Sequence, residues 1–337
     1  MTQATSQPSE RPLLSFAIPT YNRAKCLDRL LDVLLNQLQG ESRVELIVSD
    51  NASTDNTSAV VEDYRQRGLN IRYLCNETNR GVDFNFLQCY EIATGKYVWL
   101  FGDDDLIAPG TMKRVLDALA SQLYDFVCIR SYSFEGEYVL HKNFSPTPDL
   151  DMARAEDLAR HLNVFFTFIS GIIVNKERIS SVPHRPFDSL FDTNLSQLGP
   201  FYTALNHQRR SLLIRDPLIA ATGNSHVEYA LYRVFGPTFA RITGEWIEKK
   251  SVQRAIINGT IQTFFPPFLL LTRLSETSSV PEDPHQVLRA CFGYNFRYWV
   301  FDYPIYALPL PLARIWMLVV RALNKFDRMI GSFTLRS

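Results

Sequence analysis

Three consecutive carboxylates, Asp103, Asp104 and Asp105, are the residues of this 337-residue sequence whose types and spacing best suit chemistry. They follow an apolar run at 97–101, and three charges at such short range repel each other strongly. A bound divalent cation relieves that repulsion. Carboxylate oxygens are ligands that Mg²⁺ and Mn²⁺ prefer, usually with substrate phosphates completing the shell, and the metal would neutralise a departing diphosphate. The alternative, equally open on the triplet alone, is a solvated acidic turn before a helix at 111–121.

Other polar residues also follow strand-like runs. Asp50 follows the second such run, and a carboxylate there accepts hydrogen bonds from a nucleotide base or a ribose. Asp55, which follows Ser53 and Thr54, is interpreted instead as part of a helix cap. Arg80 precedes a glycine that permits a tight turn, so its guanidinium either approaches a phosphate or lies on the surface as an ordinary arginine.

The segments around these side chains alternate between strand and helix patterns. Strands separated by helical patterns of about 10–15 residues predict βαβ units, an α/β fold with a mostly parallel sheet flanked by helices. Ligands of such sheets bind beyond the carboxyl ends of the strands, so we expect Pro19 to Arg23, Asp50 and the acidic triplet at one rim. The predicted strands are 13–18, 44–48, 71–74, 97–101 and 124–131, and the predicted helices are 26–38, 53–67, 84–93 and 111–121.

The second half of the chain has a different pattern. A further strand is expected at 169–174, a loop at 182–200, and mainly helices from 229 to 274, followed by a linker rich in serine, proline and acidic residues. We therefore expect a disordered lead-in at 1–12, an α/β domain at 13–228 and a mainly helical C-terminal region at 229–337.

Composition excludes several classes of protein. Lys+Arg 35 balance Asp+Glu 35, so the whole chain has no bulk attraction for nucleic acid, although residues 286–337 hold seven Lys and Arg against two Asp, a net charge of +5. The five cysteines are scattered without a CxxC pair, which argues against a disulfide scaffold or a zinc site and for a reducing cytosol. The first residues lack the apolar segment of a secretory signal, so we expect a cytoplasmic protein.

Four motifs, in their order and spacing, resemble the N-terminal half of the family 2 glycosyltransferases of the GT-A fold. They are IPTYNR (18–23), VSDNASTDNT (48–57), NRGVDFNF (79–86) and FGDDD (101–105). The GDDD version, together with ISGIIVNK (169–176) and TGNSH (222–226), is similar to the branch that contains bacterial O-antigen abequosyltransferases.

The resemblance implies roles for individual residues in binding a nucleoside-diphosphate sugar. Asp50 would hold the nucleotide base. Asp103, with Asp104 or Asp105, would contact the ribose and the Mn²⁺ or Mg²⁺. The family often has Asp-x-Asp-Asp, and here Gly102 replaces the first acid, so the carboxylate that contacts the metal directly stays open. The residues implied to bind the nucleotide sugar are Pro19, Thr20, Tyr21, Arg23, Asp50, Arg80 and Asp103.

A catalytic base is required only if transfer inverts the anomeric configuration, because the base then activates the acceptor hydroxyl. Asp188 and Asp192 occupy the interval after the acidic motif where the resemblance implies such a carboxylate, and Asp188 is alternatively a turn residue. A retaining displacement needs no base, because the leaving phosphate accepts the proton. His226 is a candidate ligand of the metal or the diphosphate, with an ordinary surface histidine as the alternative.

The C-terminal segment 304–330 offers a candidate membrane contact. Residues 304–323 contain only two charges but three prolines, which makes a poor transmembrane helix. Arg321, Lys325 and Arg328 recur at i, i+4 and i+7 beside apolar residues, a pattern typical of an interfacial helix on anionic lipid. The alternative is a helix packed on the catalytic domain or on a second copy of the chain.

Together these observations predict a metal-dependent glycosyltransferase, with the donor bound by residues 13–131 and the acceptor by residues 132–228. The acceptor implied is a glycan, such as a lipid-linked O-antigen intermediate at the inner face of the bacterial cytoplasmic membrane, and a CDP-linked dideoxyhexose such as abequose is one candidate donor. An oligomer is compatible with this prediction. The alternatives are a non-catalytic nucleotide-sugar or glycan-binding protein on the same fold, and a nucleotidyltransferase, which the lack of a glycine-rich triphosphate loop disfavours.

Overall fold

The computed structural model describes residues 11–134, 146–223, 229–275 and 280–334, with side chains up to Lys325. The chain divides into two compact units. The first comprises the described residues of 1–153, 168–192 and 199–223, and the second those of 154–167, 193–198 and 224–337. The expected boundary at 228 lies close to the start of the last segment. The second unit also takes 154–167 and 193–198, which the sequence analysis assigned to the acceptor half. Residues 1–10 of the expected lead-in lie outside the described part.

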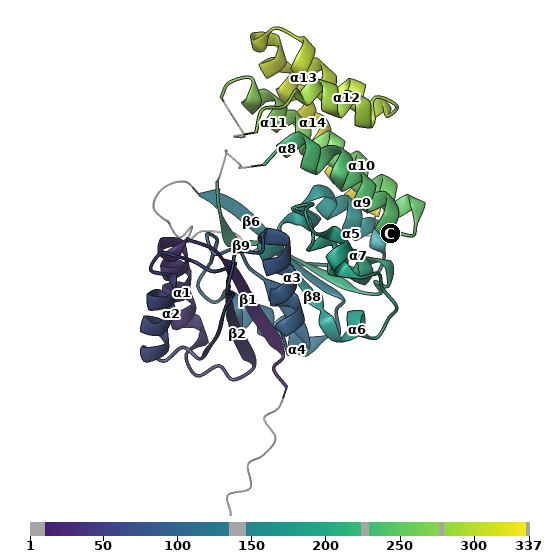
Figure 1. Cartoon of the computed structure of the whole chain (residues 1–337). Coiled ribbons are helices and arrows are strands. Elements are labelled where there is room, and N and C mark those ends of the chain that lie inside the picture. Colours follow the sequence, from purple (N-terminus) through teal and green to yellow (C-terminus); the bar gives the residue numbers. More distant parts are fainter. Residues whose placement is uncertain (1–10, 135–145, 224–228, 276–279, 335–337) are drawn as a thin grey trace, which may run out of the picture. The chain divides into compact units, whose positions relative to one another are not determined.

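A nine-stranded sheet forms the centre of the first unit, within the residues that the structure describes (Figure 1). Its order is β3-β2-β1-β4-β8-β6-β9-β5, with β7 paired to β9. The predicted α/β class is confirmed, but the sheet is mixed, because β5, β7 and β8 run antiparallel to their neighbours. The strands are β1 (Leu14–Thr20), β2 (Val44–Asp50), β3 (Ile71–Cys75), β4 (Tyr97–Leu100), β5 (Leu106–Ile107), β6 (Phe126–Phe134), β7 (Leu150–Met152), β8 (Ile172–Asn175) and β9 (Ser211–Thr222).

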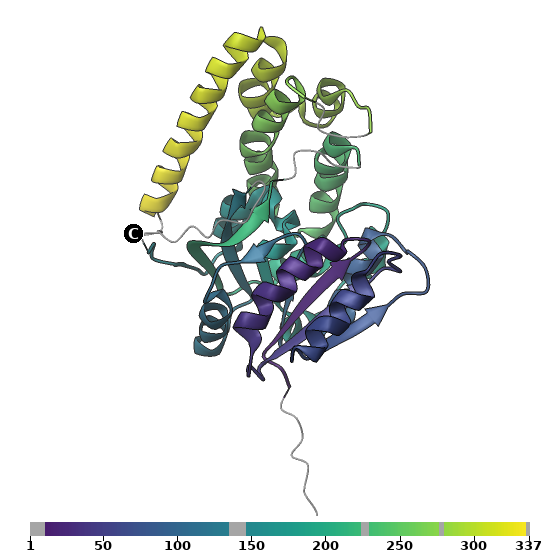
Figure 2. The same ribbon diagram turned by 90° about the vertical axis from the view of Figure 1, so that its left-hand side faces the viewer.

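Four helices connect the first strands, as the alternating pattern predicts: α1 (Ala24–Leu38), α2 (Thr57–Gln66), α3 (Val82–Ile92) and α4 (Thr111–Ser121). Figure 2 shows α1 lying along the sheet. Its buried leucines, Leu27, Leu30, Leu31, Leu34 and Leu38, follow the helical period. Helix α2 begins later than the predicted residue 53, because Ser53 and Asp55 belong to the preceding loop, where their side chains accept hydrogen bonds from the backbone of Asn22 and Ala24.

The expected strand at 169–174 is a 3₁₀ turn at Ile169–Gly171 followed by β8, which is antiparallel to both β4 and β6. Helix α6 (Lys176–Ser180) follows directly. The expected loop at 182–200 contains a short 3₁₀ helix at Phe187–Leu190, and α7 (Leu198–Asn206) begins at its end.

The second unit is mainly helical, as predicted for the C-terminal region. Its core packs large aromatic residues such as Tyr232, Phe265 and Phe292. Figure 2 shows α14 running beside the other helices of this unit, and it contacts α10 and α11. The α-helices are α5 (Ala155–Leu162), α8 (Leu231–Arg233), α9 (Phe239–Trp246), α10 (Lys250–Thr263), α11 (Phe265–Thr272), α12 (Pro284–Phe292), α13 (Tyr303–Ala307) and α14 (Leu310–Thr334), with π-helical turns at Val234–Thr238 and Tyr298–Asp302.

The proline-rich C-terminal segment folds as two helices. Pro304 and Pro311 lie in the first turns of α13 and α14, where the missing proline N–H leaves no hydrogen bond unmade. Among the described residues, one stretch, Lys250–Thr272, is long and apolar enough to cross a membrane by length and composition. It covers α10 and α11, and a core helix of a soluble protein passes the same test.

Asp302 lies in the π-helical turn of the second unit and is completely buried. Within the described residues, neither of its carboxylate oxygens has a hydrogen-bond partner. Burial raises the pKa of Asp302 well above its ordinary value, because a charged carboxylate is poorly solvated there. The native state therefore retains a proton that the unfolded chain loses above about pH 4.

We expect Asp302→Leu to raise the free energy of unfolding at pH 8 by about 1–3 kcal/mol, the cost of an unsatisfied buried polar group. In the wild type, the native state binds more protons than the unfolded state above pH 4, so its stability falls as the pH rises. Urea unfolding at pH 4 and pH 8 measures this directly. The increase in the free energy of unfolding caused by Asp302→Leu must be smaller at pH 4 than at pH 8. An equal increase at both pH values would contradict a raised pKa for Asp302.

Candidate functional site

The carboxyl ends of β1, β2 and β4 lie side by side at one edge of the sheet. Thr20, the last residue of β1, pairs with Asp50 of β2, and Ala17 of β1 pairs with Leu100 of β4. The amide of Phe101 continues this ladder to the carbonyl of Ala17, at 2.9 Å. Since β1 lies between β2 and β4, the acidic triplet follows a strand whose immediate neighbour delivers the 19–23 segment.

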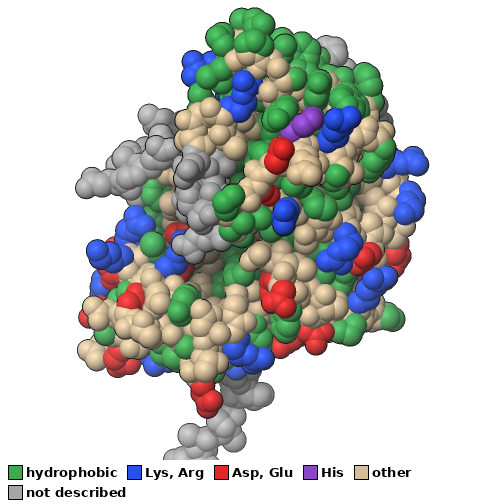
Figure 3. All heavy atoms as spheres, turned by 45° about the horizontal axis from the view of Figure 1, so that its top comes forward, with side chains coloured by type: hydrophobic (Ala, Val, Ile, Leu, Met, Phe, Trp, Pro, Cys, Tyr) green, Lys and Arg blue, Asp and Glu red, His purple; other side chains and the backbone are tan. Residues whose placement is uncertain are grey.

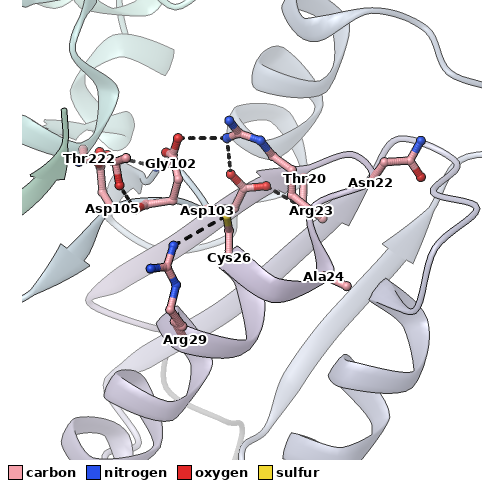
Figure 4. Close-up of polar contacts among 12 residues, drawn as sticks. Thr20, Asn22, Arg23, Ala24, Cys26, Arg29, Gly102, Asp103, Asp105 and Thr222 are labelled. Carbon is pink, nitrogen blue, oxygen red and sulfur yellow. Dashed lines mark hydrogen bonds and ion pairs between the residues drawn. The ribbon is translucent and has the colours of Figure 1, made fainter. Parts of the chain in front are cut away.

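Asp103 is buried and bound by two residues that come from the end of β1 (Figure 4). The hydroxyl of Thr20 donates to its Oδ2 at 2.7 Å, and the Nη1 of Arg23 lies 2.8 Å from its Oδ1. The same Arg23 nitrogen lies 3.0 Å from Oδ2 of Asp104, so one guanidinium bridges two carboxylates. Burial raises the pKa of Asp103 to about 6, and the charge of Arg23 and the Thr20 hydrogen bond act against that rise. Those carboxylates also raise the pKa of Arg23, although burial alone would lower it.

Asp105 is buried and bound from two later elements. The hydroxyl of Ser170 donates to its Oδ2 at 2.5 Å, and the amide of Thr222, the last residue of β9, donates to its Oδ1 at 3.0 Å. The Thr222 hydroxyl donates to the backbone carbonyl of Asp104 at 2.5 Å. Thr222 therefore holds the loop at 102–105, called the acidic loop below, through two hydrogen bonds. Burial raises the pKa of Asp105 to about 7, with a further contribution from the charge of Asp104.

Gly102 lies close to these carboxylates. A Cβ atom at this position would lie 3.2 Å from Oδ1 of Asp104, 3.3 Å from Oγ of Ser170 and 3.4 Å from Oδ2 of Asp105. Ser170 also accepts the Gly102 amide hydrogen at 2.9 Å. Contacts this short are tighter than most Cβ contacts, so a side chain at 102, where the resemblance implies an acid, would require these neighbours to shift.

The donor set suits an oxygen-preferring cation held by two carboxylates. Asp104 is partly exposed, and both its Oδ1 and the Oδ2 of Asp105 lie close to Gly102. Asp103 is instead paired with Arg23 and Thr20. No group of three or more His, Cys, Asp or Glu side chains within the described residues is arranged to hold a metal. Mg²⁺ and Mn²⁺ are commonly bound through one or two carboxylates together with substrate phosphates, and Asp104 and Asp105 fit that arrangement.

Asp50 is buried, and both its oxygens are used within the protein. Tyr73 donates its hydroxyl to Oδ2 at 2.6 Å, and the amide of Ser53 donates to Oδ1 at 2.8 Å. This carboxylate therefore holds the loop after β2 against β3. Asp55 accepts hydrogen bonds from the amide and hydroxyl of Thr57, the first residue of α2, although the N-cap residue itself is Asn56.

The other residues implied to bind a nucleotide differ in their surroundings. Pro19 is buried in β1, whereas Tyr21 is exposed in the loop that follows. Arg80 is exposed, and its guanidinium carbon lies 3.3 Å from the centre of the Phe84 ring, a cation–π contact. The backbone amide of Arg80 donates to the side chain of Asn51 at 3.1 Å, which ties its loop to the end of β2.

Asp188 and Asp192 are both exposed, at either end of a short segment that contains a 3₁₀ turn. Asp192 has a φ of +63°, a left-handed conformation that is uncommon for a residue with a side chain. The ring of its neighbour Phe191 packs edge-on against Phe84, with centroids 6.1 Å apart. His226 lies outside the described residues.

Several polar residues of this edge were not singled out from the sequence. Ser170 and Thr222 fall inside motifs of the resemblance, but each lies in or beside an apolar run, where a hydroxyl gives little signal. Asn85 is buried on α3, and its amide bonds the carbonyls of Thr20 and Ser49, at 3.4 and 3.0 Å. Asn85 is one of the buried residues of α3, which contacts β1 and β2, and an asparagine in a helical pattern gives no signal of such burial in the sequence.

Comparison with known proteins finds similarity to glycosyltransferases, mainly in the first half of the chain. Residues 15–177 match a family described as Glycosyl transferase family 2. The abequosyltransferase RfbV of Salmonella typhimurium is 34% identical over 182 residues, which cover 50% of this chain and 55% of the relative. A Campylobacter jejuni enzyme named GalNAc(5)-diNAcBac-PP-undecaprenol beta-1,3-glucosyltransferase is 27% identical over 174 residues, with the same coverage. The chain thus spans about half the length of these two relatives.

A solved structure extends the likeness to nearly the whole chain at the level of the fold. Staphylococcus aureus TarS, residues 1–349, superposes with a TM-score of 0.58 at 19% identity, covering 94% of this chain and 91% of that one. At this identity the likeness concerns the fold, a GT-A domain with further helices.

We expect Ser170→Ala to lower the free energy of unfolding by about 1–3 kcal/mol, because a buried carboxylate and the Gly102 amide both lose a hydrogen bond. Ser189→Ala is the matched control, since Ser189 is exposed and its hydroxyl donates to the local carbonyl of Pro186. Urea unfolding of both variants at pH 8 makes the comparison. Equal losses would contradict the role of Ser170 in holding Asp105.

Proposed function

Residues 15–177 belong to glycosyl transferase family 2, and on this premise we propose that the chain is a metal-dependent enzyme that transfers a sugar from a nucleoside-diphosphate sugar to a glycan acceptor. The observation that carries the proposal is the acidic loop after β4. It is bound by residues of β1, β9 and the turn before β8, and Oδ1 of Asp104 and Oδ2 of Asp105 both lie close to Gly102.

The donor diphosphate is proposed to lie at the carboxyl ends of β1 and β4, with Asp104 and Asp105 holding Mn²⁺ or Mg²⁺. When bound, the metal supplies positive charge to the diphosphate as it departs. Arg23 holds Asp103 and Asp104 in place, and its positive charge adds to the attraction for the diphosphate. Thr20 fixes Asp103 from the opposite side, so the loop does not need to reorganise when the donor binds.

Pro19, Tyr21, Asp50 and Arg80 are proposed to form the remainder of the nucleotide pocket. Both oxygens of Asp50 already accept hydrogen bonds from Tyr73 and Ser53, so Asp50 contacts a base through its remaining lone pairs. The similarity to an abequosyltransferase supports a CDP-linked dideoxyhexose as the donor. The similarity to an enzyme named for an undecaprenol-linked substrate supports a lipid-linked acceptor, at the inner face of the bacterial cytoplasmic membrane.

We expect CDP with Mn²⁺ to raise the melting temperature more than CDP or Mn²⁺ alone. At a concentration 100 times its dissociation constant, a ligand stabilises the native state by about 2.7 kcal/mol. Asp104→Asn should remove the part of this rise in melting temperature that depends on metal, and it should abolish sugar transfer. Asp117→Asn is the matched control, an exposed carboxylate on α4 that forms an ion pair with Lys113.

The same melting experiment with UDP, GDP and dTDP identifies the base. If none of the four nucleotides stabilises the protein in the presence of metal, the donor site is refuted. Metal-dependent binding without transfer or donor hydrolysis would instead favour the non-catalytic nucleotide-sugar-binding protein.

Asp192 is proposed as the base that deprotonates the acceptor hydroxyl in an inverting transfer. Three contacts support it: Phe191 packs on Phe84, the adjacent Asn85 amide reaches the carbonyl of Thr20, and Thr20 binds Asp103. The left-handed backbone of Asp192 is the kind of uncommon conformation found at functional sites.

We expect Asp192→Asn to lower kcat by about 10²–10⁴-fold, the usual contribution of a general base, with donor binding unchanged. Asp188→Asn, four residues earlier and also exposed, is the matched control and should retain activity. Transfer assays with both variants, together with an NMR assignment of the product anomer, test whether Asp192 is the base of an inverting transfer. Full activity of Asp192→Asn, or a product that retains the donor configuration, would refute the base.

A further inference from the structure

Helix α14 is apolar on two opposite faces. One face is buried in the helical unit through Ala313, Met317 and Val320, and the indole N–H of Trp316 donates to the carbonyl of Val300 at 3.0 Å. The outward face also consists of apolar residues, each between 38 and 62% exposed: Leu312, Ile315, Leu318, Val319 and Leu323. The sequence left open whether this helix contacts a membrane or packs on protein. The inner face of α14 packs on protein, and this packing does not account for the outer face. The outer face is left in contact with water.

These exposed residues form one continuous strip. At 3.6 residues per turn, Ile315, Leu318 and Val319 lie on adjacent positions opposite Ala313 and Val320, and Leu312 and Leu323 extend the strip along one side. A surface strip of large aliphatic side chains costs free energy in water, and such patches mark interaction sites.

A basic row borders the strip along its other side. Arg314, Arg321 and Lys325 are spaced by seven and four residues, so they lie on one line of the helix, and all three are exposed. The sequence from 303 to 326 contains no Asp or Glu. The outward face of α14 therefore combines apolar side chains with uncompensated positive charge, which complements a surface that is apolar inside and anionic at its boundary.

Exposed aromatic residues occur elsewhere in the same unit. Tyr294 and Phe296 lie between α12 and the following π-helical turn and are 81% and 77% exposed. Trp299 and Tyr306 are also exposed. Figure 3 shows hydrophobic side chains gathered over this part of the helical unit, with basic side chains among them. Trp and Tyr side chains are enriched at the boundary between lipid and water.

We propose that the outward face of α14 binds the surface of an anionic lipid bilayer, with its aliphatic strip inserted among the lipid chains and its basic row against the headgroups. A helix in this position lies in the plane of the interface and does not cross the bilayer. A second copy of the chain is a poorer occupant, because its own α14 would offer the same basic row and no acid from 303 to 326. Lipid binding by this face does not require the transfer reaction.

Sedimentation with lipid vesicles tests this surface. The full chain is mixed with vesicles of phosphatidylcholine alone or of equal parts phosphatidylcholine and phosphatidylglycerol. We expect binding to the anionic vesicles that weakens with salt. Arg314→Gln with Arg321→Gln should weaken it about 25-fold, since each basic residue near such a surface contributes about fivefold. Ile315→Gln with Leu318→Gln should weaken it by about tenfold or more.

The matched control is Arg241→Gln with Arg254→Gln, which removes two exposed basic residues from α9 and α10 of the same unit. This control should bind within about twofold of the wild type, because its side chains lie outside the strip. Circular dichroism verifies that every variant is folded. No binding to anionic vesicles, or an equal loss in the control, would overturn the proposal. So would a dimer that dissociates when Ile315 and Leu318 are changed while vesicle binding persists. None of these outcomes depends on nucleotide binding or transfer.

Discussion

The ion pair between Arg23 and the acidic loop is the interaction on which the site depends. Three adjacent carboxylates at the end of a strand, two of them buried, would be costly without compensation. Arg23 contacts Asp103 and Asp104 through one nitrogen, and hydroxyl and amide groups satisfy the remaining oxygens that face the protein. The protein thus concentrates negative charge at one point without losing the conformation of the loop.

That arrangement requires the particular topology of the sheet. Arg23 and Thr20 reach Asp103 because β1 and β4 are adjacent and parallel. Ser170 reaches Asp105 because the turn that holds it leads into β8, the other neighbour of β4. Thr222 is available because β9 pairs antiparallel with β5, the short strand directly after the triplet. The antiparallel strands, which make the sheet mixed, are therefore also the elements that hold the acidic loop from its second side.

The parts of this arrangement that follow from local sequence could be predicted, and the parts that depend on distant contacts could not. Apolar runs and helical periods predicted the strand ends, and therefore the rim that carries Thr20, Arg23 and the triplet. Asp50 shows the limit: it is the last residue of β2, at the predicted rim, but its two hydrogen bonds to Tyr73 and Ser53 depend on how β3 and a loop pack. The same holds for Ser170, since a serine beside an apolar strand has no pattern that reveals a carboxylate 65 residues away.

Charge explains why a chain with zero net charge has both a metal-binding and a lipid-binding face in these proposals. Between surface charges, attraction falls off over about 8–10 Å at ordinary salt concentrations, so local charge decides what each face binds. The acidic triplet and the basic row of α14 are far apart in sequence and lie in different units. Residues 286–337 carry a net charge of +5, and the rest of the chain carries −5, so the whole chain is neutral. The compensating negative charges do not lie on α14 between residues 310 and 326. Neutral composition therefore excludes neither face, and only the placement of individual charges identifies each one.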